Sequence, residues 1–328
     1  MSTVHTIDGL LVQWGDRLFY PNNRAVRSGT PSLSGAMQHT RARAMRQRIN
    51  AIVLRKAPQV MVKVTGGGRG MGAIAAHLRY ISKSGRLPFE DDRGVVRDGA
   101  EALRDLVDQW RHGGARIPER SDRREAFNIM LSMPMGTKPE IVRNAARDFA
   151  KAELANHRYA MVLHTHQANP HVHLAVRAEG HHGKRLNPRK QDLRRWREVF
   201  AEKLRERGIE AEASSQVARG SRHRTERLWQ RKAYDEGRAS NRGGYADAKL
   251  TPSRRNAAQA WCEIAKALAS SEDIANRELG RSVVNYARWL PGLRYKPPER
   301  QPQRELPGMS KVPDRSPGRT RSGPEWER

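Results

Sequence analysis

Short apolar runs alternate with longer amphipathic stretches through the middle of the chain. The runs QVMVKVT (59–65) and AFNIMLSMP (126–134) are too short for typical helices and predict buried strands. The stretches 73–84, 98–112 and 138–154 carry apolar residues at helical spacing and predict three helices.

Two further strands are predicted around a short Gln-Ala-Asn-Pro connection. RYAMVLHTH (158–166) and PHVHLAVRA (170–178) flank it, an arrangement typical of a β-hairpin. The stretch 186–208 then predicts a long helix, which begins near Asn187, ends at Gly208 and presents an apolar stripe to the sheet. The sequence therefore predicts an α+β core, in which helices pack on a central antiparallel sheet.

Composition divides the chain into four segments. Residues 1–58 hold nine Lys or Arg against two acids, and we interpret them as a basic extension outside the core. Residues 59–215 form the predicted core domain, and 216–290 a basic linker followed by helical sequence. Residues 291–328 contain eight of the 18 prolines and few large apolar residues, so we expect a disordered, basic tail.

Charge narrows the class of partner. The chain has 62 Lys plus Arg and 35 Asp plus Glu, a formal net charge of +27, which favours nucleic acid over an anionic membrane surface. Cys262 is the only cysteine, which excludes a disulfide framework and a cysteine-based zinc site. The N-terminus lacks the apolar region of a signal peptide, and no apolar run approaches a membrane span. We therefore expect a cytoplasmic protein without membrane insertion.

Four of the twelve histidines lie between residues 164 and 173. Residues two apart on a strand point the same way, so His171 and His173 should share one face, and His164 and His166 the same face of the partner strand. A solvated polar cluster is the alternative. Two facing pairs in apolar strands favour a site for a divalent ion, and three imidazole ligands with open positions are typical of catalytic metal centres.

These motifs together resemble the conjugative relaxases, mobilisation nucleases in the P-type branch of the HUH endonuclease superfamily. The resemblance covers about residues 59–215 and is carried by the helix with HLRYI and by HTHQANPHVHLAV. It implies that Tyr80 is the nucleophile and that His164, His171 and His173 bind a divalent ion, Mn or Mg, with Zn or Ni as alternatives. It also implies nicking of one strand at the transfer origin of a plasmid or mobile element, through a 5′-phosphotyrosine link that is later reversed.

Three positions near the implied centre keep alternative interpretations. The family commonly has an acid where His166 stands, so His166 could act as a base, as an orienting group or as a ligand in place of His164. His77 lies one helical turn before Tyr80 and could contact it. In some related relaxases a histidine in this region is itself the nucleophile. Tyr80 could instead be an aromatic residue that packs its helix on the sheet.

The resemblance further implies a single-stranded transfer-origin DNA substrate, accessory relaxosome proteins and a type IV coupling protein as partners. The basic tail could signal translocation to a recipient cell through a type IV secretion channel, or serve only for solubility. We expect phosphate contacts from seven basic residues: Lys63, Arg69, Arg79, Lys83, Arg194, Arg195 and Arg197.

Three other functions compete with this interpretation. VKVTGGGRGMGA contains a loose dinucleotide-binding pattern, but the polar, turn-rich SGRLPFEDDRG stands where a second parallel strand should follow. A rolling-circle replication initiator of the same superfamily would share the site, but usually places the histidine motif before the tyrosine helix. A non-catalytic DNA-binding protein with a degenerate relaxase fold would have the same charge, which leaves it open.

Overall fold

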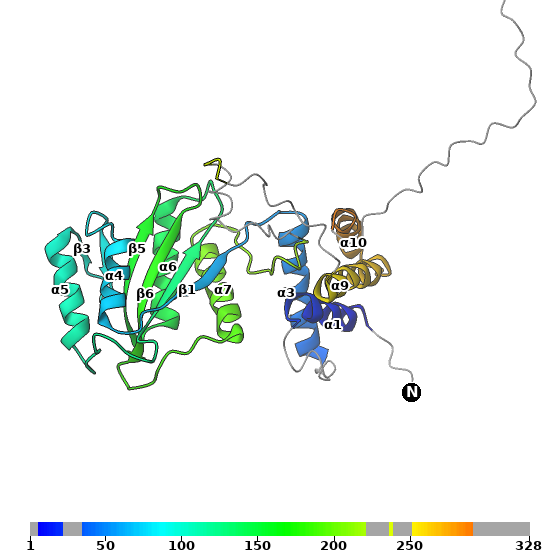
Figure 1. The fold of residues 1–328 in the computed structure, drawn as a ribbon. Helices are drawn as coiled ribbons and strands as arrows, with labels where there is room; N and C mark the ends of the chain where they lie inside the picture. Colours follow the sequence, from blue (N-terminus) through cyan, green and yellow to red (C-terminus); the bar gives the residue numbers. More distant parts are fainter. Residues whose placement is uncertain (1–5, 22–34, 221–235, 239–250, 291–328) are drawn as a thin grey trace, which may run out of the picture. The chain divides into compact units, whose positions relative to one another are not determined.

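The computed structural model describes residues 6–21, 35–220, 236–238 and 251–290 of the chain (Figure 1). The tail that we predicted to be disordered, 291–328, lies outside the described residues. No described helix combines the length and the apolar character that crossing a membrane requires.

A six-stranded sheet forms the centre of the fold, with the strand order β1-β4-β6-β5-β2-β3 (Figure 1). All of its strand pairings are antiparallel. The predicted α+β class with a central antiparallel sheet is therefore confirmed. The strands are β1 (Met61–Gly66), β2 (Phe89–Asp91), β3 (Val96–Arg97), β4 (Ala126–Ser132), β5 (His157–His164) and β6 (His171–Gly180).

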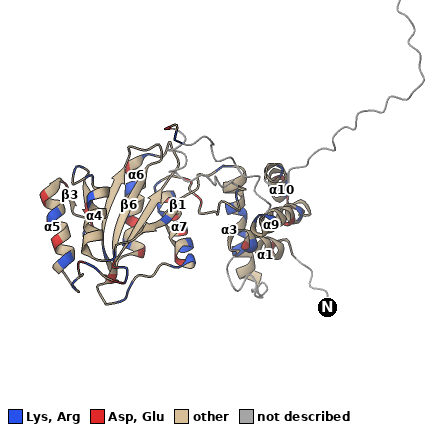
Figure 2. Ribbon diagram, viewed as in Figure 1, with Lys and Arg blue, Asp and Glu red and all other residues tan. Residues whose placement is uncertain are grey.

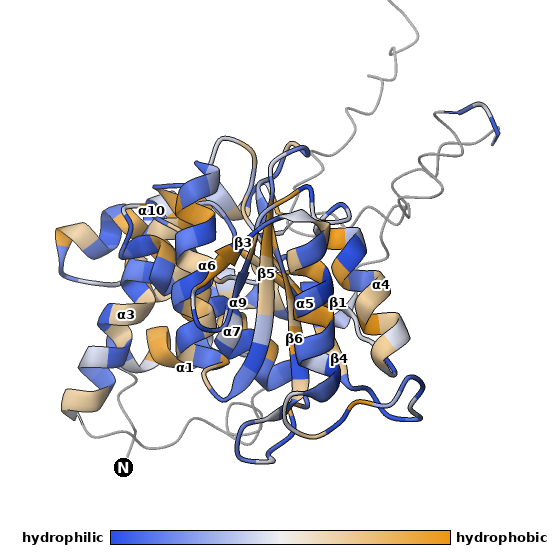
Figure 3. Cartoon of the chain, turned by 90° about the vertical axis from the view of Figure 1, so that its left-hand side faces the viewer, coloured by the Kyte–Doolittle hydropathy of each residue, from blue (hydrophilic) through white to orange (hydrophobic). Residues whose placement is uncertain are grey.

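Helices α6 (Pro139–Glu153) and α7 (Lys190–Arg205) cover one face of this sheet. Alternate residues of each strand point to this face, because the side-chain period of a strand is two. Val172, Leu174 and Val176 of β6 accordingly share a buried core with residues of both helices. Figure 3 shows hydrophobic residues along the central strands and hydrophilic ones on outer surfaces of the helices.

Helices α4 (Met71–Ile81) and α5 (Gly99–His112) cover part of the opposite face. The core on this side contains Leu78 of α4, Trp110 of α5 and the small Ala160 and Ala175 of the sheet. An alanine presents little side chain, so a helix can lie close to the strands above it. This core covers only part of the face, because His164, His171 and His173 continue the face as polar side chains.

A glycine-rich connection, residues 66–70, leads from β1 into α4. Gly70 has a φ of 102°, and a Cβ atom there would lie 2.3 Å from the carbonyl oxygen of Glu119. The amide of Met71 donates to the carbonyl of Pro118 at 2.9 Å, so this helix start is bonded to protein rather than open to a phosphate. The next strand, β2, pairs antiparallel with β5, which removes the parallel unit that dinucleotide binding requires.

Four helices at the two ends of the described chain share a second hydrophobic core: α1 (Ile7–Phe19), α3 (Gly35–Val53), α9 (Pro252–Ala269) and α10 (Ile274–Ala287). Leu11, Ile49, Trp261 and Val283 are among its fully buried members. The segment 1–58, which we interpreted as an extension outside the core, thus contributes to a core of its own. Arginines flank the narrow apolar stripes of α1 and α3. The helices that cover these stripes, α9 and α10, lie about two hundred residues further along the chain.

Candidate active site

The hairpin of β5 and β6 brings three histidines together. His164 and His171 are direct partners across the two strands, and His173 faces Val162. Directly opposed residues of an antiparallel pair lie on the same face of the sheet, so all three rings lie on the face that α4 partly covers. One ring nitrogen from each lies within 4.8 Å of those of the other two.

Backbone carbonyls orient two of these rings. The Nε2 atom of His164 lies 2.6 Å from the carbonyl oxygen of Ile81, and Nδ1 of His171 lies 2.9 Å from that of Asn169. A carbonyl can only accept, so these nitrogens carry the protons. His164 Nδ1 and His171 Nε2 are then left with free lone pairs, as in protein metal sites where a carbonyl orients the ligating imidazole.

The third ring has a buried atom without a partner. His173 Nδ1 has no hydrogen bond among the described residues, and such a buried group costs about 1–3 kcal/mol. Burial, and after it the neighbouring histidines His164 and His171, lowers the pKa of His173 to about 3. Burial also lowers the pKa of His164. Neutral imidazoles with free lone pairs are the donors that a divalent cation requires, so the residues present fit a metal ion.

Tyr80 lies near this cluster, at the C-terminal end of α4. Its side chain is 73% exposed, which excludes the alternative of an aromatic residue packed against the sheet. The ring of His77 lies 6.5 Å from that of Tyr80 and 6.5 Å from that of His173, measured between centroids, so His77 lies near both. His77 Nε2 is buried without a partner among the described residues, and burial lowers the pKa of His77.

His166 lies at the rim of the cluster. Strand β5 ends at His164, so the predicted strand 158–166 is two residues too long, and His166 lies exposed in the connection. The expectation that His164 and His166 share a strand face was therefore wrong, because the chain already turns after His164. The ring of His166 still lies 5.0 Å from that of His164, between centroids. The group of atoms close enough to hold one ion comprises His164, His171 and His173.

Three of the seven residues predicted to contact phosphates lie on the histidine side: Lys63, Arg79 and Lys83. Lys63 of β1 is exposed and lies opposite Met130, which itself lies opposite His173, so all three share a face. Arg79 and Lys83 are exposed beside Tyr80. Arg69 precedes α4, at the other end of this helix from Tyr80, and donates to the carbonyl of Asp122.

The other three, on α7, lie across the sheet from the histidines. Arg195 forms an ion pair with Glu153 at 2.6 Å, and Arg194 lies over the ring of Tyr20 at 5.5 Å. Burial lowers the pKa of Arg197. Figure 2 shows Lys and Arg on several helices, α5 and α7 among them, so charge alone does not mark the site.

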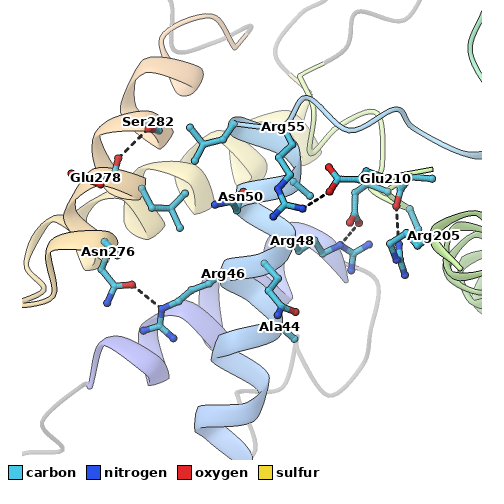
Figure 4. Close-up of a pocket in the computed structure, with 18 of the residues that line it drawn as sticks. Ala44, Arg46, Arg48, Asn50, Arg55, Arg205, Glu210, Asn276, Glu278 and Ser282 are labelled. Carbon is cyan, nitrogen blue, oxygen red and sulfur yellow. Dashed lines mark hydrogen bonds and ion pairs between the residues drawn. The ribbon is translucent and has the colours of Figure 1, made fainter. Parts of the chain in front are cut away.

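A cavity of about 990 Å³ lies elsewhere in the described residues, and none of the histidines of the cluster lines it. Its walls come mainly from α3, α7, α10 and the chain after α7 (Figure 4). Arg48 and Arg55 in this wall pair with Glu212 and Glu210, each at 2.5 Å, and Arg46 donates to Asn276 at 2.9 Å. These paired cations offer little free positive charge, so the cavity is a weaker candidate than the histidine cluster.

Sequence reasoning missed the two carbonyl groups that orient the histidines. Asn169 also accepts the amide of Met135 through Oδ1 at 2.9 Å, which joins the connection between β5 and β6 to the chain after β4. The Asn-Pro pair in this connection was a usable signal for a structured turn. Nothing in the sequence marks the carbonyl of Ile81, which lies 83 positions before His164.

Comparison with known families identifies the nuclease region. Residues 89–209 match the family model described as "Relaxase: MobA/VirD2-like, nuclease domain". This part of the chain is therefore similar to MobA/VirD2-like relaxase nuclease domains, the family that the motifs predicted. The matched region includes all three clustered histidines and begins after Tyr80.

The other two comparisons add little. No curated protein matches the chain. A solved structure described as "Molecular Basis of Vancomycin Resistance Transfer in Staphylococcus aureus" is similar at 15% identity, covering 48% of this chain and 99% of that chain. Its TM-score of 0.32 is too low to support an argument about this chain.

Proposed function

We propose that this protein is a DNA relaxase that nicks one strand at the transfer origin of a plasmid or mobile element and later rejoins it. The observation that carries the proposal is the cluster of three histidine nitrogens on the same sheet face as α4, whose end bears the exposed Tyr80. The relaxase family of residues 89–209 supports the same activity.

His164, His171 and His173 would hold a divalent ion, Mn or Mg, with Zn or Ni as alternatives. Such an ion supplies positive charge to the non-bridging oxygens of the scissile phosphate. The two carbonyl bonds keep His164 and His171 in the orientation that this requires. The partly buried His173 adds a donor that stays unprotonated at neutral pH.

Tyr80 would attack the phosphorus through its phenolic oxygen. The new P–O bond forms as the bond to the 3′ oxygen breaks, which leaves the 5′-phosphate on Tyr80 and releases a 3′-hydroxyl that takes up a proton. A free phenol has a pKa of about 10, so Tyr80 needs a proton acceptor. His77 Nε2 is suited to this role, since it lacks a partner and burial lowers the pKa of the ring. His166 at the rim is the alternative base.

The substrate would be single-stranded DNA, held first by the exposed Lys63, Arg79 and Lys83 on the histidine side. Arg69 and the arginines of α7 would contact phosphates only if the strand continues around the domain. Accessory relaxosome proteins, a type IV coupling protein, action in the bacterial cytoplasm and passage to a recipient cell belong to the same proposal. Type IV secretion would use the basic tail.

The test uses labelled single-stranded oligonucleotides that tile the DNA beside the coding sequence, incubated with the full chain and Mn²⁺ or Mg²⁺. We expect a covalent protein–DNA adduct on denaturing gels, lost on chelation. Tyr80→Phe should abolish the adduct and retain DNA binding, because only the attacking oxygen is removed. Tyr286→Phe, on α10, is the matched control and should keep the adduct.

Two outcomes would contradict this assignment. An adduct that survives Tyr80→Phe and disappears in His77→Ala would make His77 the nucleophile. DNA binding without cleavage in any of the tiled oligonucleotides would favour the non-catalytic DNA-binding protein.

A further inference from the structure

The C-terminal end of α4 has an unusual backbone. Lys83 and Ser84 have φ angles of 49° and 61°, a left-handed conformation that residues other than glycine rarely adopt. The helix ends at Ile81, and amides of the turn donate to the carbonyls of Leu78, Arg79 and Tyr80 before it. Left-handed residues cost free energy, so the surrounding contacts must hold this turn in place.

Hydrogen bonds of the Ser82 side chain stabilise the turn. Its side chain is buried, donates to the carbonyl of Leu78 at 2.7 Å and accepts the amide of Gly85 at 3.1 Å. Gly85 then accepts the amide of Gly99 at 2.9 Å, at the start of α5. A Cβ at Gly85 would lie 2.5 Å from the carbonyl oxygen of Gly99, so the two backbones touch. The turn is thus attached to α5 on one side.

The side chain of His164 is hydrogen-bonded to the other side of this turn. Its Nε2 donates to the carbonyl of Ile81, the residue directly after Tyr80, at 2.6 Å in a buried setting. The same ring contributes to the cluster suited to a metal ion. One imidazole thereby connects the histidine cluster to the backbone that carries the tyrosine.

We propose that the hydrogen bond from His164 to the Ile81 carbonyl is a positioning link between the histidine cluster and Tyr80. Divalent-ion binding and the placement of Tyr80 are then coupled, because a ring held at Nδ1 by an ion can aim Nε2–H in only one direction. Ser82 and the left-handed pair Lys83 and Ser84 keep the carbonyl where that direction points. The inference rests on the proposed function for its meaning, but it can be tested without DNA.

The experiment measures amide hydrogen exchange in the full chain, without DNA, with and without Mn²⁺. The amides of Ser82, Ser84, Gly85 and Leu87 all donate within this turn and report its opening. We expect Mn²⁺ to slow their exchange by about 2- to 10-fold, the change that one ordinary hydrogen bond produces. The amides of the β5–β6 hairpin between His164 and His173 report ion binding in the same sample.

Two substitutions at His164 separate the link from the ligand. His164→Ala removes both, and should speed exchange of the turn even in metal-free protein. His164→Gln keeps an amide nitrogen near the place of Nε2, so it should restore slow exchange in metal-free protein while losing the response to Mn²⁺. His171→Gln is the matched control, since it removes a ligand candidate and leaves the link to Ile81 intact.

Equal exchange of the turn in His164→Ala and in the native chain, both free of metal, would overturn the proposal. Protection of the hairpin by Mn²⁺ without any change in residues 82–87 would also overturn it. Failure of DNA cleavage would leave these outcomes readable, because they concern only the turn and the ion. If His164→Ala does not fold, the native chain with and without Mn²⁺ decides the matter.

Discussion

The two faces of the sheet differ in a way that β6 displays within a single strand. Val172, Leu174 and Val176 point toward α6 and α7 and are fully buried in a continuous apolar core. The residues between them point the other way, and there Ala175 lies under α4 whereas His171 and His173 continue the face as polar groups. One face therefore forms a closed apolar core, and the end of the other carries the candidate site. Because side chains alternate between the two faces, one strand can be fixed by the core on one side and present candidate ligands on the other.

The largest expected effect is the contrast between substitutions on the two faces of the sheet. The double variant His171→Ala, His173→Ala should lose metal-dependent cleavage completely while its free energy of unfolding changes little, because two of three ligand candidates disappear from a partly open face. Leu174→Ala should instead lower the free energy of unfolding by about 2–5 kcal/mol, through a cavity in the closed core, and cleave normally while folded.

Cleavage assays and urea denaturation of both variants check this contrast. Full metal stoichiometry in the double histidine variant would show that the ion, if any, binds elsewhere. A severe loss of stability in that variant would mean that the histidine face also carries the fold.

A smaller effect concerns pH and the metal-free protein. The folded pKa of His173 is lowered to about 3 by burial and by its neighbours, whereas the unfolded pKa is near 6.5. Between these values the unfolded chain binds the additional proton, so the free energy of unfolding should fall as the pH falls from about 6.5 toward 3. His173→Asn removes one titrating group and should make this dependence less steep, while His77, His157 and His164, whose pKa values are also lowered, keep part of it. An identical slope in urea denaturation series of the two proteins at several pH values would refute the account.

The smallest effect separates the two sets of basic residues. Each phosphate contact to a single strand contributes about −0.7 to the slope of log affinity against log salt. Lys63→Ala with Arg79→Ala should therefore reduce the slope by about 1.4 if both contact phosphates. Arg194→Ala with Arg195→Ala, on the opposite face, should change it less, since Arg195 already pairs with Glu153.

Binding titrations of a labelled oligonucleotide over a range of salt concentrations measure both slopes. Equal reductions in the two double variants would show that the strand passes around the domain to α7. These point variants are better probes than removal of residues 1–58, which would delete α1 and α3 from the second hydrophobic core.

Much of the nuclease fold could be predicted because its elements have strong local patterns. The strands around 59–65, 126–134 and 158–178 were recognised from short apolar runs, and the hairpin from its Asn-Pro connection. The boundary at His164 was missed, since alternation of residue types continues to His166 after the strand has ended. The role of the helices near the ends was harder to predict, because α1 and α3 bury their apolar stripes against α9 and α10, which are distant in the sequence.

The sequence by itself determined that four histidines lie close together on a hairpin and that a tyrosine stands near the end of an amphipathic helix. Both follow from local periodicity and spacing, which depend on neighbours in the chain. Only the tertiary structure decided which histidines converge, that His77 lies near both Tyr80 and His173, and that the Ile81 carbonyl meets His164. Those contacts join distant segments through backbone carbonyls and buried rings. A carbonyl is common to every residue, so no residue type in the sequence records which one a side chain will meet.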